Sequence, residues 1–505
     1  MTFPNLKRVL VLAGVVFVAV AVSFLVPRKP RALAVGEVRV AFWSWRTRVP
    51  SQAELEESFA PTRAKTLFLR AGQFEVESDG VHRIRPVTGT LPPRVETHLV
   101  YNATRKFLGE FERLDIPSTA IAIADTYRED LGRANKDRAN IRGFQLDFDV
   151  PSRLLPNYAL LLESLRQTLP RDTEISITGL PAWTASNDIA LVLDKVDFWI
   201  PQFYGGDLPT HASERIPIAS PADVARSTAR VRQLGKPFYA GLSAYGYGIL
   251  YGKDGSLIEL RGNIDPSTAA RHSDLELIDR RSFDENAGPA ETRYEYRATR
   301  DLVINGLTVH TGETLMLDLP NSAALRAEAK AVRENAGELL LGICMFRLPT
   351  AQDNMILSPS EVAAALADEE TKATTSISVF SMKGRLTVRA KNQGTASSQV
   401  GDGAMTLDLT IRAGTVARVA KLEGFSKYET LCSVGGEKGS VRPCSAARAD
   451  VLRLTTSAWS PDMSASAEFQ VGVELPERVT GSVTTYVDDG RVEQQPIDLP
   501  ITGEK

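Results

Sequence analysis

The stretch GFQLDFDVP, residues 143–151, decides the fold and poses the question of function. Apolar and polar residues alternate along it, as they do in a β-strand whose two faces meet different surroundings. The polar face carries three side chains, Gln145, Asp147 and Asp149. A strand flanked by hydrophobic residues therefore points two carboxylates the same way, and the fold around it must explain why.

Seven further apolar runs of strand length accompany this stretch and alternate with helical patterns. The eight runs cover residues 37–45, 65–74, 97–103, 143–150, 174–183, 196–205, 237–246 and 339–348. Residues 154–169 show the helical pattern clearly, because leucines and a tyrosine recur there at the spacing of one helix face. Eight strands that alternate with helices predict a parallel (β/α)8 TIM barrel.

Two segments depart from this rhythm. Between the seventh and eighth runs, alternating residues around Asn-Gly and Thr-Gly turns predict a β-rich insertion at about residues 253–318. Beyond the barrel, short alternating strands separated by Gly, Ser, Asn and Asp predict an immunoglobulin-like β-sandwich. We expect a barrel domain at residues 35–366 and a sandwich domain at residues 372–505.

The pattern of charged and apolar residues at positions 1–34 predicts a targeting segment. Lys7 and Arg8 precede an uncharged apolar run at residues 9–26, whose 18 residues suit both a short membrane anchor and a long signal-peptide core. An Ala-Leu-Ala sequence at residues 32–34 could be cleaved. Both alternatives predict export to the cell envelope, either anchored in the inner membrane and facing the periplasm or secreted. We favour the uncleaved signal anchor.

Charge and cysteine content narrow the partners. The chain of 505 residues has a net charge of −3 and lacks a long basic block, so no nucleic-acid partner is expected. Of three cysteines, Cys344 lies in an apolar run, whereas Cys432 and Cys444 flank a turn-rich stretch and could form a disulfide in an oxidising compartment. No CxxC pair or neighbouring histidine accompanies them, and neither a metal site nor a cofactor is expected.

The predicted barrel gives the two aspartates a position. The active site of such a barrel lies at the carboxyl ends of its strands, and Asp147 and Asp149 come late in the fourth strand, before Pro151. Two neighbouring carboxyls do not readily both ionise, so one of them is expected to hold a proton near neutral pH. Glycoside hydrolysis requires such a proton at the leaving oxygen. Helix capping, an arginine partner or calcium binding are alternative roles for the pair.

The same stretch resembles the strand-four signature of the family 18 glycoside hydrolases, in which spaced acidic residues end in a catalytic glutamate followed by an aromatic residue and a proline. The resemblance implies that Asp149 is the general acid and Asp147 its supporting aspartate. Gln145 and Arg142 stand where the family has further acidic residues, and the acid is an aspartate rather than a glutamate. The chitinase pattern is therefore not satisfied.

Other parts of the chain carry further resemblances. VDFWIPQFYG, residues 196–205, resembles strand six of the same family and implies that Gln202 and Tyr204 orient the substrate, while GLSAYG implies a place for Tyr245 at the mouth. QLDFD, LLPNYALLLESLRQTLP and SITGLPAW resemble an uncharacterised family of chitinase-like barrels, domain-of-unknown-function family 3142, over about residues 37–250. That second resemblance implies the barrel fold and no particular substrate.

The partner of the acid is left open by the sequence. A carboxylate across the site, about 5 to 9.5 Å away, would act as nucleophile or base, and Asp207 or Glu75 could supply it. The family 18 resemblance implies instead that the acetamido oxygen of the substrate takes this role, held by Tyr204. We prefer the substrate-assisted mechanism.

Further residues near strand ends could bind a sugar. Aromatic rings stack on apolar sugar faces, although core packing is the alternative for many of them. The aromatic candidates are Trp43, Trp45, Trp183, Tyr204, Tyr245 and Tyr247. Arg70 and Arg347, late in the second and eighth strands, could bind an anionic substrate or pair with the aspartates.

Two functions remain. The first is an exported, membrane-anchored glycoside hydrolase that acts on an envelope or extracellular polysaccharide. The second is a non-catalytic glycan-binding protein with a degenerate chitinase-like barrel, as the missing acidic positions indicate. The sequence does not discriminate between chitin-like, peptidoglycan-like and acidic glycans.

Overall fold

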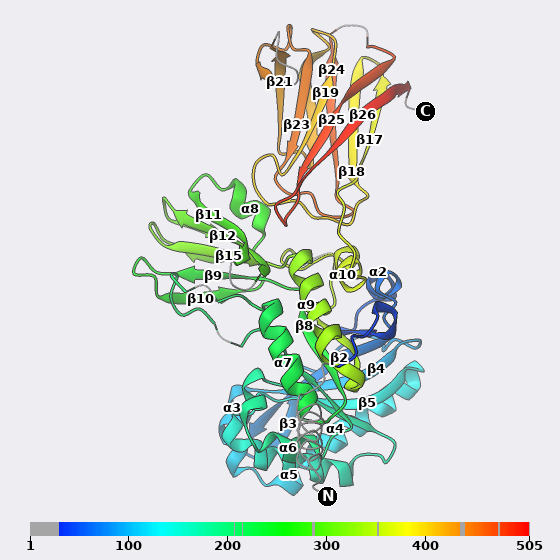
Figure 1. Ribbon diagram of the computed structural model, residues 1–505, viewed down its shortest axis with the longest axis vertical. Coiled ribbons are helices and arrows are strands. Elements are labelled where there is room, and N and C mark those ends of the chain that lie inside the picture. The colour runs from blue at the N-terminus through cyan, green and yellow to red at the C-terminus, as the bar shows by residue number, and fades with distance from the viewer. Residues whose placement is uncertain are drawn as a thin grey trace, which may run out of the picture.

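The computed structural model describes residues 30–206, 208–214, 216–284, 288–350, 353–434, 440–472 and 475–503. Figure 1 shows a barrel at the bottom, a small β-rich part beside its upper end, and a β-sandwich at the top. The predicted signal segment at residues 9–26 lies outside the described residues. Within the part of the chain that the structure describes, no helix is long and apolar enough to span a lipid bilayer.

Eight parallel strands among the described residues close into a barrel. They are β1 (Arg39–Ser44), β2 (Thr66–Glu77), β4 (Glu96–Ala103), β5 (Asn140–Asp147), β6 (Glu174–Gly179), β7 (Phe198–Pro201), β8 (Phe238–Ser243) and β16 (Leu340–Phe346). Each strand pairs in parallel with its neighbours, and β1 pairs with both β2 and β16, so the sheet closes on itself. The predicted TIM barrel is confirmed.

Helices connect successive strands and cover the outside of the barrel. They are α2 (Gln52–Thr62), α3 (Arg105–Glu110), α4 (Ile116–Asp137), α5 (Leu155–Thr168), α6 (Ile189–Leu193), α7 (Pro221–Gln233), α9 (Ser322–Asn335) and α10 (Pro359–Leu366). Short 3-10 turns accompany them at η1 (Val35–Glu37), η2 (Phe111–Arg113), η3 (Ser152–Leu154), η4 (Pro181–Ala185) and η5 (Gly337–Leu339). The connection from β2 to β4 instead holds the strand β3 (Gly80–Ile84), which pairs antiparallel to β2.

The alternation of residues in each barrel strand directs side chains to two different cores. In β5, Phe144 and Leu146 are fully buried against the surrounding helices, in a cluster that also contains Tyr158 of α5. The opposite face carries Gln145 and Asp147 toward the barrel interior. The two faces of β5 therefore meet an apolar layer outside and polar partners on β1 and β6 inside, as the sequence pattern requires.

The insertion between β8 and β16 contains a five-stranded antiparallel sheet in the order β10-β9-β15-β12-β11. Its elements are β9 (Tyr247–Tyr251), β10 (Leu257–Arg261), α8 (Pro266–Arg271), β11 (Leu275–Asp284), β12 (Gly288–Ala298), β13 (Leu302–Ile304), β14 (Leu307–Val309) and β15 (Thr314–Leu319). The sheet begins at Tyr247, closer to β8 than residue 253, where we place the start from sequence. Asn305 and Gly306 connect β13 to β14 with the positive φ angles, 48° and 78°, that a tight hairpin requires.

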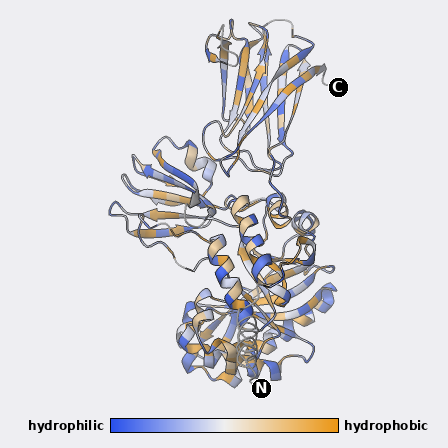
Figure 2. Cartoon of the chain, viewed as in Figure 1, coloured by the Kyte–Doolittle hydropathy of each residue, from blue (hydrophilic) through white to orange (hydrophobic). Residues whose placement is uncertain are grey.

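The C-terminal part is the predicted β-sandwich. One sheet contains β17 (Thr375–Met382), β18 (Arg385–Asn392), β20 (Val416–Glu423) and β24 (Ser464–Val471). The other contains β19 (Met405–Thr410), β21 (Lys427–Ser433), β22 (Val441–Pro443), β23 (Val451–Thr456) and β25 (Arg478–Tyr486). The long strand β26 (Val492–Gly503) pairs with β25 and, near its end, with β17, and so joins the two sheets. Figure 2 shows hydrophobic and hydrophilic residues alternating along these strands.

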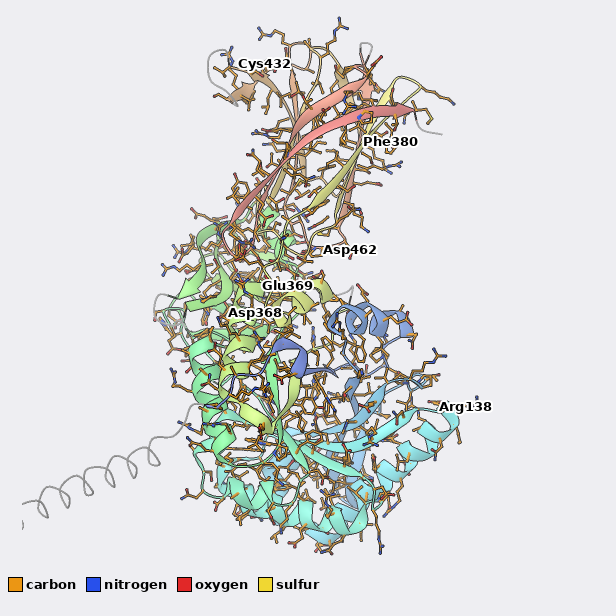
Figure 3. The ribbon with its side chains drawn as sticks, turned by 45° about the vertical axis from the view of Figure 1, so that its right-hand side comes forward. Arg138, Asp368, Glu369, Phe380, Cys432 and Asp462 are labelled. Atoms are coloured by element: carbon orange, nitrogen blue, oxygen red, sulfur yellow. A yellow bond between two sulfur atoms is a disulfide. The ribbon has the colours of Figure 1, made fainter. Side chains whose placement is uncertain are left out.

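The cysteines lie in two different surroundings. Cys432 and Cys444 form a disulfide, with Cα atoms 5.8 Å apart, whereas Cys344 is a buried free thiol in the barrel interior. Figure 3 shows Cys432 at the end of the sandwich remote from the barrel and Asp462 at the end that faces it. The disulfide therefore stabilises the outer end of the sandwich, far from the barrel strands.

Candidate active site at the barrel mouth

The first polar side chain on the inward face of β5, Gln145, makes hydrogen bonds inside the barrel with both its amide oxygen and its amide nitrogen. Gln145 has no exposed surface, and its Oε1 accepts a hydrogen bond from Nε1 of Trp43 at 2.9 Å. Its Nε2 donates to Oγ of Ser176 on β6 at 3.1 Å. An acid at this position would bury a charge beside an indole and a hydroxyl, so the glutamine gives a neutral floor below the two aspartates.

Asp147 lies one layer higher, at the end of β5, and is half-buried. Its Oδ1 accepts a hydrogen bond from Oγ1 of Thr178, late in β6, at 2.6 Å. Burial, with the neighbouring Asp149 carboxylate, raises the pKa of Asp147 to about 7, against the opposing effects of the Thr178 hydrogen bond and the charge of Arg70. The aspartate pair therefore keeps a proton up to about neutral pH.

Asp149 follows in the loop after β5 and is exposed at the barrel mouth, the end of the barrel where the carboxyl ends of its strands meet. Surrounding protein atoms raise the pKa of Asp149 above its ordinary value, although the residue remains in contact with solvent. Among the described residues, none donates a hydrogen bond to its carboxylate. Of the two aspartates, Asp149 is thus the one whose carboxyl is open to a ligand.

Tyr204 belongs to an aromatic cluster in the same mouth. Its buried ring stacks on Phe346 of β16, with centroids 5.7 Å apart, and meets the edge of Tyr245 at 6.2 Å. Burial raises the pKa of Tyr204 well above its ordinary value, followed by the effects of Tyr245, Asp147 and, more weakly, Asp149. The tyrosine therefore stays protonated as a hydrogen-bond donor, and the structure brings it into the electrostatic field of both aspartates.

The two predicted arginines differ in their surroundings. Arg70 is buried, its Nε donates to Oδ1 of Asn102 at 3.2 Å, and its guanidinium lies 5.9 Å from the ring of Trp45. Its charge acts on Asp147, so Arg70 belongs to the mouth. Arg347 instead pairs with Asp353, at 2.7 Å, and not with the aspartates of β5.

Two predicted sugar platforms are wrong. Trp183 is 1% exposed in η4, and its Nε1 donates to the carbonyl of Val150 at 2.8 Å, so its ring packs in the outer core beside Tyr158. Trp43 is 2% exposed between Phe68 and Phe346 inside the barrel. Neither ring has a free face, and the role of Trp43 is to hold Gln145.

Three further predicted residues follow β7 and β8 in the sequence. Gln202 is half-buried, and its backbone forms a bridge with Gly241 of β8. Tyr245 is half-buried, with its ring 5.2 Å from that of Phe346. Both lie at the mouth, whereas Asp207 lies outside the described residues.

Thr178 is a mouth residue that the sequence analysis missed. Ser176 and Thr178 alternate on the inward face of β6 in the same way that Gln145 and Asp147 do on β5. The alternation that singles out β5, applied to the next strand, would have identified Thr178. Trp45, one of the predicted aromatic candidates, lies against Arg70, and nothing in the sequence places these two side chains together.

Solved structures similar to this chain include a spore cortex-lytic enzyme, a chitinase and a chitinase-like agglutinin. The spore cortex-lytic enzyme SleL of Bacillus megaterium is 15% identical, with a TM-score of 0.42 over 68% of this chain and 76% of that chain. A chitinase of Chromobacterium violaceum is 14% identical, with a TM-score of 0.43 over 65% and 99% of the two chains. A chitinase-like agglutinin of Robinia pseudoacacia is 13% identical, with a TM-score of 0.41 over 65% and 99%.

Comparison of the sequence finds one family match, which covers part of the barrel. A search of the curated proteins finds no match to this chain. The resemblance to an uncharacterised barrel family is confirmed for the segment from α3 to α8, which contains β5 and the aspartate pair. Residues 105–271 match the model of the family described as "Domain of unknown function (DUF3142)".

Proposed function

We propose that this chain is an exported glycoside hydrolase that cleaves an N-acetylated polysaccharide of the cell envelope or the extracellular space, with Asp149 as the general acid. One observation carries the proposal. At the carboxyl end of β5, two neighbouring aspartates lie at the mouth of a closed barrel, and one is held by Thr178 while the other is open to solvent.

The two aspartates have different roles in acid catalysis. Burial raises the pKa of Asp147 to about 7, so the pair retains a proton near neutral pH, and Asp149, whose carboxyl is open to solvent, is the member that delivers the proton to a substrate. Asp149 gives this proton to the glycosidic oxygen as the bond to the anomeric carbon breaks, and the electron pair of that bond leaves with the oxygen. Water then reacts at the anomeric carbon and returns a proton to Asp149.

Tyr204 supports the substrate-assisted form of this reaction. In it, the acetamido oxygen of the sugar attacks the anomeric carbon, and a donor must hold that acetamido group in place. The Tyr204 hydroxyl stays protonated, since its pKa is raised well above the ordinary value, and it makes no hydrogen bond to another described residue. It is therefore free to hold a substrate.

Export is supported by two independent features. The apolar run at residues 9–26 is of the length of a signal anchor or signal-peptide core. The Cys432–Cys444 disulfide is of a kind that persists in oxidising compartments. We propose a periplasmic or secreted location on this basis, with membrane attachment through the N-terminal segment.

The experiment compares turnover of chitin oligosaccharides and peptidoglycan fragments by the wild type and Asp149→Asn. We expect the variant to lose at least about 100-fold in kcat, as general acid catalysis implies. Asp172→Asn is the matched control, because Asp172 is also exposed but precedes β6, at the opposite end of the barrel. Turnover that survives in Asp149→Asn would refute the role of the acid.

Non-catalytic glycan binding is the second candidate. It is favoured by the loss of the outer acidic positions, since Gln145 is bonded to Trp43 and Arg142 is paired with Glu174 at 2.9 Å. In that case, the wild type and Asp149→Asn bind the same glycans, and neither releases a product.

A further inference from the structure

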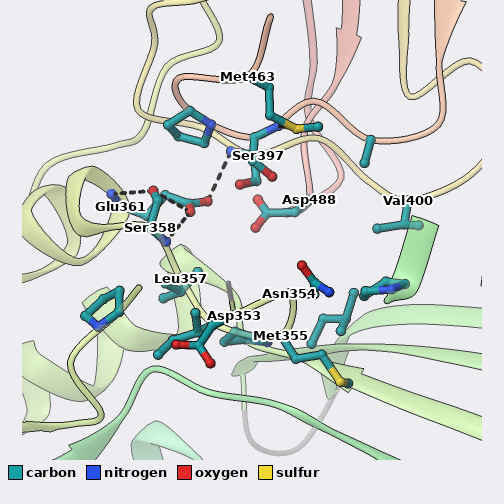
Figure 4. A pocket seen from close by; sticks show the side chains of 18 of the residues that line it. Asp353, Asn354, Met355, Leu357, Ser358, Glu361, Ser397, Val400, Met463 and Asp488 are labelled. Carbon is teal, nitrogen blue, oxygen red and sulfur yellow. Dashed lines mark hydrogen bonds between the residues drawn. The ribbon is translucent and has the colours of Figure 1, made fainter. Parts of the chain in front are cut away.

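A cavity of about 520 Å³ lies where the barrel, the insertion and the sandwich meet (Figure 4). None of the mouth residues Asp147, Asp149 or Tyr204 is among the described residues that line it. Each of the three parts contributes polar side chains to the wall, such as Ser267, Thr292, Asn354, Glu361, Ser397 and Asp488. The volume falls within the range of about 300 to 1,000 Å³ that is usual for small-molecule sites.

Asp488 is the unusual side chain of this cavity. It is 7% exposed, and among the described residues its Oδ1 has no hydrogen-bond partner and its carboxylate no ion pair. Figure 4 shows the carboxylate inside the cavity, directed toward Glu361. Its backbone carbonyl accepts hydrogen bonds from Oγ1 of Thr292 at 3.2 Å and Nδ2 of Asn321 at 3.4 Å, so the residue is fixed in position. A buried carboxylate without a partner costs free energy, which either uptake of a proton or a ligand that donates to it can offset.

Glu361 faces the same space from α10 and is 2% exposed. Its Oε1 accepts the backbone N–H of Ser397 at 3.1 Å, and its Oε2 accepts that of Ser358 at 2.9 Å. Burial raises the pKa of both Glu361 and Asp488, and the charge of Glu361 raises that of Asp488 further. The two carboxyls thus lie together in the cavity wall and hold protons more tightly than exposed carboxyls do, unless a cation favours their ionised forms.

Among the described residues, the rest of the wall supplies no cation to these two carboxyls. Of the described lining residues, six are acidic and none is Lys, Arg or His. Asp353 is neutralised elsewhere, by Arg347 at 2.7 Å. Arg491 lies close enough to Asp488 to lower its pKa, but it is bonded to Asp489 at 2.7 Å, and Asp489 opposes that effect. A cationic ligand would therefore meet acidic side chains and no competing cation among the described residues of this wall.

The size of the cavity and the apolar side chains of its wall favour an organic cation over a metal ion as the ligand. A metal ion would leave most of the volume empty, and Glu361 already accepts a hydrogen bond at each oxygen. Met355 and Met463 border the cavity on either side of Asp488 in Figure 4, together with proline and leucine residues of the wall. Flexible methionine side chains adapt to the apolar body of a small molecule. An ammonium group can meanwhile donate to the free carboxylate.

We propose that the junction cavity binds a small organic molecule with a primary ammonium group, which donates to Asp488 and lies beside Glu361, while its apolar body contacts Met355 and Met463. The ligand bridges the sandwich, which supplies Asp488, and the barrel, which supplies Glu361. This site is separate from the barrel mouth and does not depend on the proposed hydrolase activity.

Calorimetric titration of the full-length protein tests the proposal at pH 7.5. The cationic probes are glucosamine, 1,4-diaminobutane and cyclohexylamine, and the neutral counterparts are N-acetylglucosamine and cyclohexanol. We expect at least one cation to bind with a Kd below about 1 mM, and its neutral counterpart to bind at least tenfold more weakly. Asp488→Asn should raise the Kd of the cation at least tenfold. The control Asp402→Asn, which changes an exposed aspartate of the same sandwich, should leave this Kd unchanged.

A measurement on the wild type alone covers the case in which Asp488→Asn does not fold. Because both carboxyls have raised pKa values and an ammonium group favours their ionised forms, affinity must fall from pH 7.5 to pH 5.5, and binding must release protons into the buffer. Failure of all three cations to bind, equal binding of a cation and its neutral counterpart, or binding that releases no protons would each overturn the proposal.

Discussion

The hydroxyl of Thr178 donates a hydrogen bond to Oδ1 of Asp147 at 2.6 Å, from β6 to β5. This bond opposes the rise in pKa that burial and Asp149 impose on Asp147. It favours the ionised form of Asp147 and so helps the pair to release, through Asp149, the proton that burial makes it retain. The proposed roles of the two aspartates therefore depend on a single hydroxyl of the neighbouring strand.

Thr178→Val removes that hydroxyl with little change of volume. A hydrogen bond to a charged group contributes about 1.5 to 3 kcal/mol, and a tenfold change in proton affinity corresponds to about 1.4 kcal/mol. We therefore expect the pKa of Asp147 to rise above about 7, the alkaline limb of the kcat/KM profile to move to higher pH, and kcat/KM at neutral pH to fall about tenfold. Thr178→Ser keeps the donor and should keep the wild-type profile. A Thr178→Val profile that overlays that of the wild type contradicts the assignment.

Tyr204→Phe tests substrate assistance. The Tyr204 hydroxyl has no hydrogen bond to other described residues, and the ring contacts with Phe346 and Tyr245 are available to phenylalanine as well. We expect the melting temperature to stay within about 2 °C of the wild type, while kcat on N-acetylated substrates falls about 100-fold. Glycans with a hydroxyl in place of the acetamido group should not be cleaved by either protein. Equal turnover of both substrate types by the wild type would point to a protein base instead.

The barrel and the position of the aspartate pair could be predicted because both follow from local alternation. The inward and outward faces of β5 are readable from residues 143–151 alone, since a strand has a period of two. The turn at Asn305 and Gly306 is readable for the same reason, because its conformation depends on two adjacent residues.

Features that depend on distant packing could not be predicted in this way. Trp43 and Trp183 occupy strand ends, but whether their rings face a ligand depends on Gln145 and Val150, which supply their hydrogen-bond acceptors. The partner of Arg347 belongs to a loop whose path the sequence does not define. The junction cavity is the extreme case, because Glu361 and Asp488 meet only once the sandwich docks on the barrel.

The disulfide gives a prediction about the sandwich. Cys432 and Cys444 are 12 residues apart, and closing a loop of this size in the unfolded chain stabilises the native state by about 3 kcal/mol in the chain-entropy model. We expect the double variant Cys432→Ser, Cys444→Ser to unfold at lower denaturant concentration in the transition that reports on the sandwich. A reductant should lower the denaturant midpoint of the sandwich transition in the wild type to that of the double variant. The midpoint of the double variant should not change. The unfolding transition of the barrel is the internal control, because the cysteine of the barrel, Cys344, is a free thiol that forms no disulfide.

Glu328 on α9 gives a prediction about stability and pH. The residue is 4% exposed beneath the insertion, and burial, with the charge of Glu291, raises its pKa to about 8. The folded state therefore binds this proton more tightly than the unfolded state, whose glutamates titrate at about 4.3. Between these two values the folded protein holds more protons, so the contribution of Glu328 to stability is full below the lower pKa and is lost as pH rises through the higher one.

Glu328→Gln should remove this dependence. At pH 5 the wild type and the variant should unfold with similar free energies, because the glutamate is protonated and resembles glutamine in size. At pH 8.5 the variant should be more stable by several kcal/mol, with an upper limit of about 5 kcal/mol. Glu334→Gln, on the same helix but half-exposed, should leave the difference from the wild type constant with pH. Urea unfolding at pH 5, 7 and 8.5 measures all three proteins, and a constant difference between the wild type and Glu328→Gln would show that Glu328 is ionised in the folded protein throughout this range.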